Sequence, residues 1–552
     1  MKKKILAAIL AATMAMSMLA GCGAKEETPA SSDAPVASSS EASAESSTAP
    51  VEEAYAPTYP YETDVTLRVY IGGGIGLSTG QTAYEDIPFC KGLVEKIGID
   101  VEWMYPPVGS DGNAAYNLML MEEELPHVIF GYYTNASSMQ DLIDDGIALN
   151  LNDYFEEYAP AYYATINSGD PYMEKNLGLM KIDDGTVPAF NSFRSSPWGC
   201  CYQGILIRQD WLDEIGLKAP TTMAEMEDVL VAFKEKYGAF YTSTLQRMGF
   251  AFSSAMGAMG TTHGHYIEDG TVKANVEAPG LKDLITKMND WYEKGLLDPN
   301  WATGDNAYYA QMSLEDKMGV TVNAISQQTK WLQDSEGAGA VRDWVGIPSM
   351  TNEAGNTVHW IQTEYSTFTG SFGAYVTTEC DTEEELKAAM AWIDWAYTEE
   401  GQMYWNFGTE GVSYEMVDGK PQFTDMLWND QRGIAQALKD YTAASSMPVG
   451  IQLEEFVRAK NSVKAGDSVD AWTSNQDAAD YYVPGMSYPD DVRQQNSDIN
   501  TAVSTYVSEQ LTKMIMGEVS IDTWDDFIAQ CKSLGLDTQT ANIQAAYDEF
   551  IK

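Results

Sequence analysis

Residues 65–71 read Val-Thr-Leu-Arg-Val-Tyr-Ile and place an apolar side chain at every second position. Because successive side chains of a strand point to opposite faces, this period of two predicts a β-strand. The alternation returns at 99–103, and a short apolar run follows at 127–130. Helix-length segments at 87–97 and 113–124 separate the three runs. The order strand, helix, strand, helix, strand predicts a parallel sheet covered by helices.

Further along the chain, the sequence predicts the N-termini of two helices. Thr222 and Thr382 each precede a glutamate by three residues, Glu225 and Glu385, and apolar residues at helical spacing follow. This is the pattern of a capping box, in which the two side chains bond to each other's backbone N–H groups. Apolar residues at helical spacing also run through 524–534, before a glycine that ends the helix. The body of the chain is therefore predicted to be α/β throughout.

Composition restricts the size class and the partners. The chain has 552 residues, 44% of them hydrophobic, and 33 Lys and Arg stand against 81 Asp and Glu, giving a net charge of −48. The length allows two to four domains at roughly 100–200 residues each. A charge this negative excludes a nucleic-acid-binding protein, because affinity for nucleic acid comes mainly from Lys and Arg on phosphates. It also disfavours binding to anionic lipid through a basic face.

The N-terminus predicts the cellular compartment. Three lysines at 2–4 precede an apolar stretch at 5–19, which is shorter than the roughly 20 residues of a membrane-spanning helix. A basic start and a short apolar core are typical of a signal peptide, here residues 1–21. The stretch ends in Leu-Ala-Gly-Cys, which resembles the lipobox of bacterial lipoproteins and implies that the Cys22 thiol carries the lipid anchor. The alternative is a soluble secreted protein with a chance cysteine.

Residues 22–61 are predicted to be a lipid-anchored, disordered tether. Most of this segment is Ala, Ser, Glu, Pro and Thr, with too few large apolar side chains to offset the entropy of ordering. A chain of this kind has a root-mean-square span of about 30 Å. The tether would hold a folded body at the extracellular face of the cell membrane while leaving it free to turn.

The remaining cysteines predict no disulfide framework. Cys90, Cys200, Cys201, Cys380 and Cys531 are an odd number, and two of them are adjacent in the sequence. A disulfide between neighbouring residues is strained, so we expect buried thiols.

Five stretches together resemble a known family. Residues 205–222 read Ile-Leu-Ile-Arg-Gln-Asp-Trp-Leu-Asp-Glu-Ile-Gly-Leu-Lys-Ala-Pro-Thr-Thr and resemble a segment of the extracellular solute-binding proteins, the receptors of ABC sugar importers. The resemblance is to the lipoprotein branch related to maltose- and alginate-oligosaccharide-binding proteins. Residues 401–424 carry the most specific match, with Asn-Phe-Gly-Thr-Glu-Gly and Asp-Gly-Lys-Pro. The other stretches are 118–131, in which His127 stands where Asp is usual, 281–301 and 521–550.

The resemblance implies an α/β, two-lobed, periplasmic-binding-protein-like fold with a hinge and an interlobe cleft. The hinge strands would be 204–208 and 371–377. The ligand would bind in the cleft, which closes over it. The expected lobes are 62–197 plus 369–425 for lobe one and 198–368 plus 426–552 for lobe two.

Ligand-binding residues are expected in loops at the carboxyl ends of strands, where open α/β sheets gather their sites. The loops selected in this way carry aromatic side chains with polar neighbours. The candidate residues are Tyr132, Tyr133, Asn135, Phe193, Arg194, Trp198, Asn323, Trp360, Glu364, Tyr365, Trp405 and Glu410.

Pairs of aromatic and polar side chains suit a sugar, because a pyranose has an apolar face and a rim of hydroxyls. The chain has 32 Tyr and 14 Trp against 16 Phe, so most of its aromatic rings carry a polar group. For each ring, the alternative is a place in the core. The acidic composition favours a neutral oligosaccharide over a uronic-acid polymer, although a local arginine would reverse this. The expected partners are the permease subunits of an ABC transporter, with the receptor a monomer.

No catalytic, metal or cofactor site is predicted. Residues 72–76 are glycine-rich but lack the last glycine of a dinucleotide fingerprint, and no P-loop is present. His263 and His265 lack further metal ligands nearby in sequence, and residues 298–305 lack the EF-hand spacing. Two alternatives remain open. A lipoprotein glycoside hydrolase would shorten its oligosaccharide, and a peptide-binding receptor would prefer peptides in titrations.

Overall fold

A computed structural model of the chain describes residues 55–72, 77, 80–107, 110–132, 136–170, 173, 180–182, 185–245, 247, 252, 256, 264–337, 339, 341–351, 368–443, 449–474, 481, 483–484, 486 and 488–551. Within these ranges, every helix is too short or too polar to cross a lipid bilayer. Cys22 lies outside the described residues.

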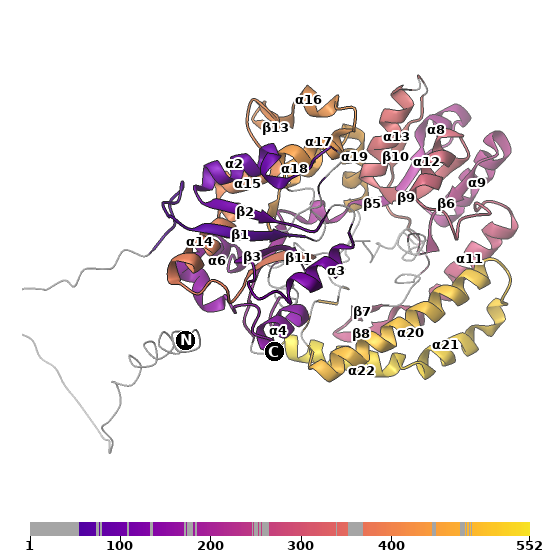
Figure 1. Cartoon of the computed structure of the whole chain (residues 1–552). Coiled ribbons are helices and arrows are strands. Elements are labelled where there is room, and N and C mark those ends of the chain that lie inside the picture. The colour runs from indigo at the N-terminus through magenta and orange to yellow at the C-terminus, as the bar shows by residue number, and fades with distance from the viewer. Residues whose placement is uncertain are drawn as a thin grey trace, which may run out of the picture.

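The first body, here called lobe one, is built on a six-stranded sheet (Figure 1). The three strands predicted at 65–71, 99–103 and 127–130 lie at one side of it, in the order β3, β1, β2, with Val69 opposite both Trp103 and Val128. The complete order is β14-β4-β11-β3-β1-β2. The strands are β1 Thr66–Ile71, β2 Asp100–Met104, β3 Val128–Tyr132, β4 Phe190–Arg194, β11 Phe368–Val376 and β14 Gly450–Gln452.

Helices cover the sheet of lobe one and bury its apolar side chains. Leu67 and Val69 of β1 are fully buried against Leu93 and Ile97 of α2, as the predicted strand–helix unit requires. The helix predicted at 113–124 is shorter in the structure and ends at Met119. The helices of this lobe are α2 Pro88–Ile97, α3 Gly112–Met119, α4 Ala136–Asp144, α5 Phe155–Tyr158, α6 Pro160–Ile166, α14 Glu383–Asp394 and α15 Glu399–Phe407.

The second body, lobe two, is built on a four-stranded sheet in the order β10-β5-β9-β6. Its strands are β5 Gln203–Arg208, β6 Phe240–Thr242, β9 Met318–Ala324 and β10 Trp344–Gly346, and a hairpin of β7 His265–Glu268 with β8 Thr271–Ala274 lies apart from the sheet. Its helices are α8 Gln209–Ile215, α9 Met223–Tyr237, α11 Leu281–Glu293, α12 Asn306–Leu314, α13 Ile325–Gly337, α20 Asp490–Ile515, α21 Trp524–Ser533 and α22 Leu536–Phe550.

Both predicted capping boxes are confirmed. At the start of α9, the Thr222 hydroxyl accepts a hydrogen bond from the N–H of Glu225, and the Glu225 carboxylate accepts one from the N–H of Thr222. Thr382 and Glu385 make the same pair of bonds at the start of α14. Each box satisfies two backbone donors that a helix N-terminus otherwise leaves unpaired.

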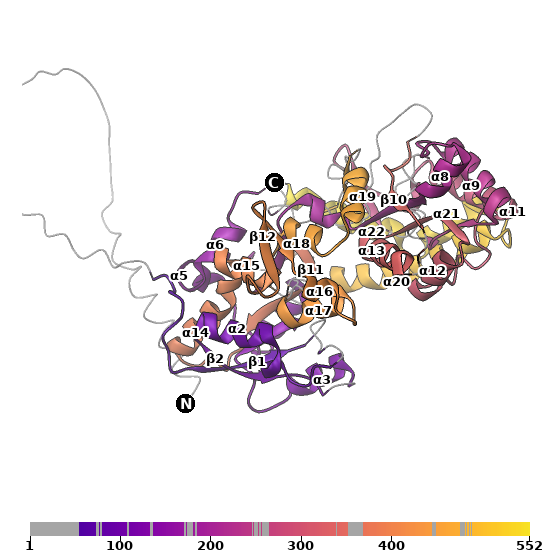
Figure 2. The ribbon, with the colours of Figure 1, turned by 90° about the horizontal axis from the view of Figure 1, so that it is seen from above.

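A third group of elements joins the two bodies (Figures 1 and 2). These are β12 Tyr414–Val417, β13 Lys420–Phe423, α16 Asp425–Trp428, α17 Ile434–Tyr441, α18 Glu454–Ala459 and α19 Val463–Thr473. One apolar cluster runs through them, since Phe407 of α15 and Tyr414 of β12 share it with Leu206 of β5 and Trp344 of β10.

Four cysteines are free and buried in the structure, as predicted: Cys90, Cys201, Cys380 and Cys531. Burial raises the pKa of the Cys90 thiol to about 12, so it stays protonated at neutral pH.

Three tyrosines precede residue 62, the predicted start of lobe one. The rings of Tyr55, Tyr59 and Tyr61 pack against the core of lobe one. The Tyr59 hydroxyl donates a hydrogen bond to the carbonyl oxygen of Ala391, at 2.8 Å. The division of the chain at the predicted lobe boundaries stays a prediction.

Candidate functional site

The carboxyl ends of five strands lie at one edge of the lobe-one sheet. Strand β1 is parallel to β2 and β3, and β4 is parallel to β14. Strand β11 is antiparallel to both β3 and β4, so these two also run the same way. The shared edge is therefore formed by Ile71, Met104, Tyr132, Arg194 and Gln452.

An equivalent edge exists in lobe two. Strands β9 and β10 are each antiparallel to β5, and β6 is parallel to β9. The carboxyl ends of β6, β9 and β10 therefore lie at the edge where β5 begins, at Gln203.

The two edges meet where the chain passes between the lobes. Strand β4 ends at Arg194 and β5 begins at Gln203, with only a 3₁₀ turn at Pro197–Cys200 between them. The predicted hinge segments 204–208 and 371–377 each lie mostly within one sheet, and the crossing itself is the segment before β5. Open α/β sheets bind their ligands at such strand ends. The junction of the two edges is therefore the candidate site.

Two crossings are hydrogen-bonded side by side. The N–H of Ser195 donates to the carbonyl oxygen of Gln452 at 2.9 Å, and the N–H of Glu454 donates to the Ser195 hydroxyl at 2.9 Å. The Ser196 hydroxyl donates to the Glu454 carboxylate. The segment that leaves lobe one after β4 is therefore hydrogen-bonded to the segment that leaves it after β14.

Trp198, a predicted ligand-binding residue, also takes part in the contacts between these segments. Its indole N–H donates to Asp470 of α19 at 2.7 Å, and the Arg458 guanidinium lies 3.8 Å from its ring centroid. Arg458 in turn donates to Asp470 and Glu454, at 3.0 and 2.8 Å. The polar group of Trp198 is therefore used within the protein. Its contact with a ligand stays a prediction.

Gly204 allows α19 to approach β5 closely. A Cβ atom at this position would lie 2.5 Å from the ring of Trp472, whose N–H donates to the carbonyl oxygen of Ile205 at 3.0 Å. Only glycine leaves room for this ring against the strand.

Arg194 lies at the end of β4 with its aliphatic part along Gly199 of the crossing. Its Nε is buried and has no hydrogen-bond partner, and none of the described carboxylates pairs with its guanidinium. Lys460, at the end of α18, holds its ammonium 4.8 Å from the ring centroid of Phe456. Burial, and then the nearby charge of Arg194, lower the pKa of Lys460 to about 8. The charges of these two cations thus act on each other at the crossing.

The lobe-two edge carries several buried polar atoms without protein partners. Asn323, a predicted residue, is fully buried, and its Oδ1 accepts the N–H of Ala324 at 2.9 Å while its Nδ2 bonds to nothing described. The hydroxyl of Tyr309 and the Nη1 of Arg247 also have no described hydrogen-bond partner. Buried polar groups are normally hydrogen-bonded, so such atoms mark places for water or ligand.

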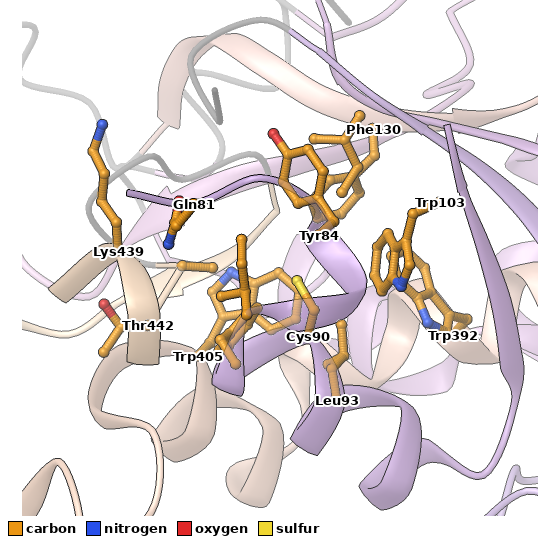
Figure 3. A pocket seen from close by; sticks show the side chains of 14 residues that line it. Gln81, Tyr84, Cys90, Leu93, Trp103, Phe130, Trp392, Trp405, Lys439 and Thr442 are labelled. Atoms are coloured by element: carbon orange, nitrogen blue, oxygen red, sulfur yellow. The ribbon is translucent and has the colours of Figure 1, made fainter. Parts of the chain in front are cut away.

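Two predicted aromatics lie in the core of lobe one rather than in loops, which corrects the expected placement. Phe193 is inside β4 and Trp405 inside α15, and each is 1% exposed. The Trp405 ring packs on Phe89 and Phe130. Its Nε1 has no described partner and borders a cavity of about 40 Å³, room for about one water molecule (Figure 3). Their apolar surface explains the burial, because rings of this size contribute most to a core.

The other predicted residues are placed as follows. Glu410 is exposed in the turn before β12. Tyr132 ends β3, and its side chain is not described. Tyr133, Asn135, Trp360, Glu364 and Tyr365 lie outside the described residues.

Comparison with known proteins decides the family. The family model described as bacterial extracellular solute-binding protein matches residues 88–403. The chain belongs to this family. This solute-binding protein is 23% identical to lipoprotein LipO of Bacillus subtilis over 476 residues, 81% of this chain and 86% of that one. It is 22% identical over 497 residues to the fructooligosaccharide ABC transporter substrate-binding protein FusA of Streptococcus pneumoniae, 83% of this chain and 86% of that one.

Solved structures share the fold. The alginate-binding protein AlgQ2, in a structure without calcium ion, is 22% identical with a TM-score of 0.67, covering 89% of this chain and 99% of that one. An HMO binding, ABC-transporter associated solute-binding protein from Bifidobacterium longum infantis is 20% identical with a TM-score of 0.69, covering 88% of this chain and 98% of that one. The predicted two-lobed, periplasmic-binding-protein-like α/β fold is confirmed.

Sequence reasoning did not select Lys460 and Arg247 as candidate site residues. Arg247 follows the carboxyl end of β6, so the strand-end rule would have selected it had this three-residue strand been recognised. Lys460 follows a six-residue helix, and no sequence signal connects it to the site.

Proposed function

We propose that this solute-binding protein is a lipid-anchored extracellular receptor that binds an oligosaccharide between its lobes and delivers it to the permease of an ABC importer. Membership of the family supports a binding role. The names of relatives support the ligand class, since one is a polygalacturonan/rhamnogalacturonan-binding protein of Bacillus subtilis and another a fructooligosaccharide ABC transporter substrate-binding protein.

The observation that carries the proposal is the junction of the two sheet edges. Buried polar atoms without partners, among them Nε of Arg194 and Nδ2 of Asn323, lie on the elements that form it. Hydroxyl-rich ligands need many hydrogen-bond partners, and atoms left unpaired by the protein can supply them without breaking existing bonds.

Closure of the lobes follows from the same geometry. The crossing segments are short and lie side by side, so a few residues can absorb the rotation of one lobe against the other. Binding would bury the sugar between the lobes, and the permease would recognise the closed form. The receptor acts as a monomer in this proposal.

Anchoring through Cys22 is part of the proposal. Its support is the lipobox-like sequence and the similarity to a protein named as a lipoprotein. Metabolic labelling with a palmitate analogue should label the full-length protein, and Cys22→Ser should abolish the label and release the protein from membranes. Unchanged label in Cys22→Ser contradicts the anchor.

We also infer that the protein leaves its ligand chemically unchanged. Glycoside hydrolysis needs two carboxyl groups about 5–9.5 Å apart, one of them with a raised pKa. Within the described part of the chain, Asp394 is the carboxyl whose pKa is raised, to about 7, by burial. It lies in the core of lobe one and accepts the N–H groups of Tyr162 and Ala161 at 2.7 and 3.3 Å. This acid therefore serves the fold.

The test is calorimetric titration of the purified protein with a panel of oligosaccharides and a panel of peptides. We expect saturable binding of at least one oligosaccharide, recovery of that sugar at full length by chromatography, and a smaller radius of gyration by X-ray scattering when it is bound. Binding confined to peptides contradicts the proposal, and shortened sugar products would replace it with hydrolysis.

A further inference from the structure

Apart from Arg493 of α20, the arginines of the described chain fall into two groups. In the first, each guanidinium is paired with a carboxylate. Its members are Arg68, Arg208, Arg342, Arg432 and Arg458. The second group is Arg194 and Arg247, which have no carboxylate partner among the described residues. Each keeps a buried nitrogen without a hydrogen bond, as the paired Arg342 also does.

Unpaired cations are unexpected in this protein. The chain has 81 acidic residues for 33 Lys and Arg, so carboxylates are abundant for every cation. A buried nitrogen of a charged group without a partner costs free energy, because the charge has lost water and gained nothing in return. Although acidic residues are abundant in this sequence, none of the described carboxylates pairs with Arg194.

Arg194 is also close to a second cation. Lys460 has only the Phe456 ring as a described partner for its ammonium, and the charge of Arg194 acts on it. Two neighbouring positive charges repel each other. The carboxylates of the same crossing do not relieve this repulsion, since Glu454 and Asp470 are both bonded to Arg458. The pair therefore presents positive charge that the protein does not neutralise.

Arg247 extends this pattern to lobe two. It follows β6 at the edge that meets lobe one, and its charge acts on the hydroxyls of Tyr241 and Tyr309, of which the Tyr309 hydroxyl has no described hydrogen-bond partner. A cation with adjacent hydroxyl donors is suited to a carboxylate flanked by sugar hydroxyls.

We propose that the oligosaccharide bound by this protein is acidic, and that a carboxylate on one of its sugar units is bound by Arg194 together with Lys460. Arg247 binds a second acidic unit from the lobe-two side. The inference rests on the proposed oligosaccharide-binding function. It reverses the expectation of a neutral ligand, which came from net charge, because the local cations and not the distant surface set the potential at the site.

The first test uses two probes that differ only in charge. Calorimetry compares an oligogalacturonate with its fully methyl-esterified form, alongside neutral oligosaccharides of similar length. We expect the acid to bind at least 10-fold more tightly than the ester, with an affinity that falls as NaCl rises from about 50 to 500 mM. Equal affinity for the acid and the ester, or binding of neutral oligosaccharides only, overturns the inference and leaves the proposed function standing. Binding of no oligosaccharide at all overturns both.

The second test uses matched variants. Arg194→Gln and Lys460→Gln should each weaken binding of the oligogalacturonate about 10–100-fold, as for loss of a charged hydrogen bond. Arg194→Lys should recover part of the loss. Lys513→Gln, which removes an exposed lysine paired with Glu509 on α20, should leave the affinity unchanged. Thermal unfolding of each variant verifies that it is folded. Wild-type affinity in folded Arg194→Gln and Lys460→Gln overturns the inference.

Discussion

The two consecutive strands β4 and β5 each end in an arginine, and the two arginines have opposite surroundings. Arg208 closes β5 in lobe two and is 2% exposed, with its guanidinium donating to Asp210 at 2.6 and 2.8 Å and to Asp316 at 2.7 Å, over the ring of Trp211. Arg194 closes β4, just before the crossing into β5, and has no carboxylate partner among the described residues.

This difference distinguishes arginines that stabilise the fold from arginines whose guanidinium is available to bind a ligand. A guanidinium that serves the fold is held by carboxylates of the protein, since breaking a buried pair is costly. An arginine that must bind a changing partner cannot be saturated in advance. Arg208 and Arg194 are therefore expected to respond to mutation in opposite ways.

The largest expected effect on stability is at Arg208, the arginine that is paired with carboxylates. Arg208→Gln should lower the free energy of unfolding by about 2–3 kcal/mol, because Asp210 loses its two-pronged contact with the guanidinium, whereas Asp316 keeps Arg342. Denaturant unfolding measures this. Arg208→Lys should recover only part of the loss, since an ammonium cannot form the two-pronged contact with Asp210. A loss below 1 kcal/mol would break the comparison.

A second prediction concerns the pH dependence of stability that results from the lowered pKa of Lys460, near Arg194. The pKa of Lys460 is lowered to about 8 in the folded state, whereas an unfolded lysine titrates near 10.4. Between these pH values the unfolded chain binds more protons, so this group makes stability rise with pH from about 8 to about 10, by about 2 kcal/mol. Other groups titrate there too, so the measurement is the difference between wild type and Lys460→Met.

The control for that measurement is Lys513→Met, which removes a lysine whose pKa is raised by its hydrogen bond to Glu509. The rise in stability should remain in this variant and be lost in Lys460→Met. Identical pH profiles for wild type and Lys460→Met would mean that neither burial nor the charge of Arg194 lowers the pKa of Lys460.

A third prediction tests the close approach at the start of β5. Gly204→Ala should destabilise the protein by about 1–3 kcal/mol, because the new methyl group overlaps the ring of Trp472. Gly112→Ala is the matched control, since a Cβ there meets open space at the start of α3. This change should be neutral or slightly stabilising. Equal thermal shifts for the two variants contradict the packing at the crossing.

The smallest expected effect is at Trp198. Trp198→Phe keeps a ring beneath Arg458 but loses the N–H that bonds to Asp470, which should cost about 1 kcal/mol of stability. Ligand affinity should change less than in Arg194→Gln. If affinity falls more than stability, Trp198 contacts the ligand as first predicted from the sequence.

Much of the fold could be predicted because its signals are local. The alternation in β1 and the capping boxes at Thr222 and Thr382 need only a few consecutive residues. Strand β6 has three residues and shows no alternation of its own; its place beside β9 depends on tertiary packing. The strand-end rule consequently missed Arg247.

The site was less predictable, because its character depends on partners distant in sequence. Trp405 follows an expected loop pattern, but its ring fills the core of lobe one against Phe89. Nothing local distinguishes Arg194 from Arg208, since each ends a strand. Only the folded structure shows that acids surround one arginine and that a lysine lies near the other.

The most direct test of this account measures stability and ligand affinity together in Arg208→Gln and Arg194→Gln, with an oligogalacturonate as the probe. We predict that Arg208→Gln loses stability and, once folded, binds like wild type, whereas Arg194→Gln keeps or gains stability and binds at least 10-fold more weakly. Loss of stability without loss of affinity in Arg194→Gln would contradict the account.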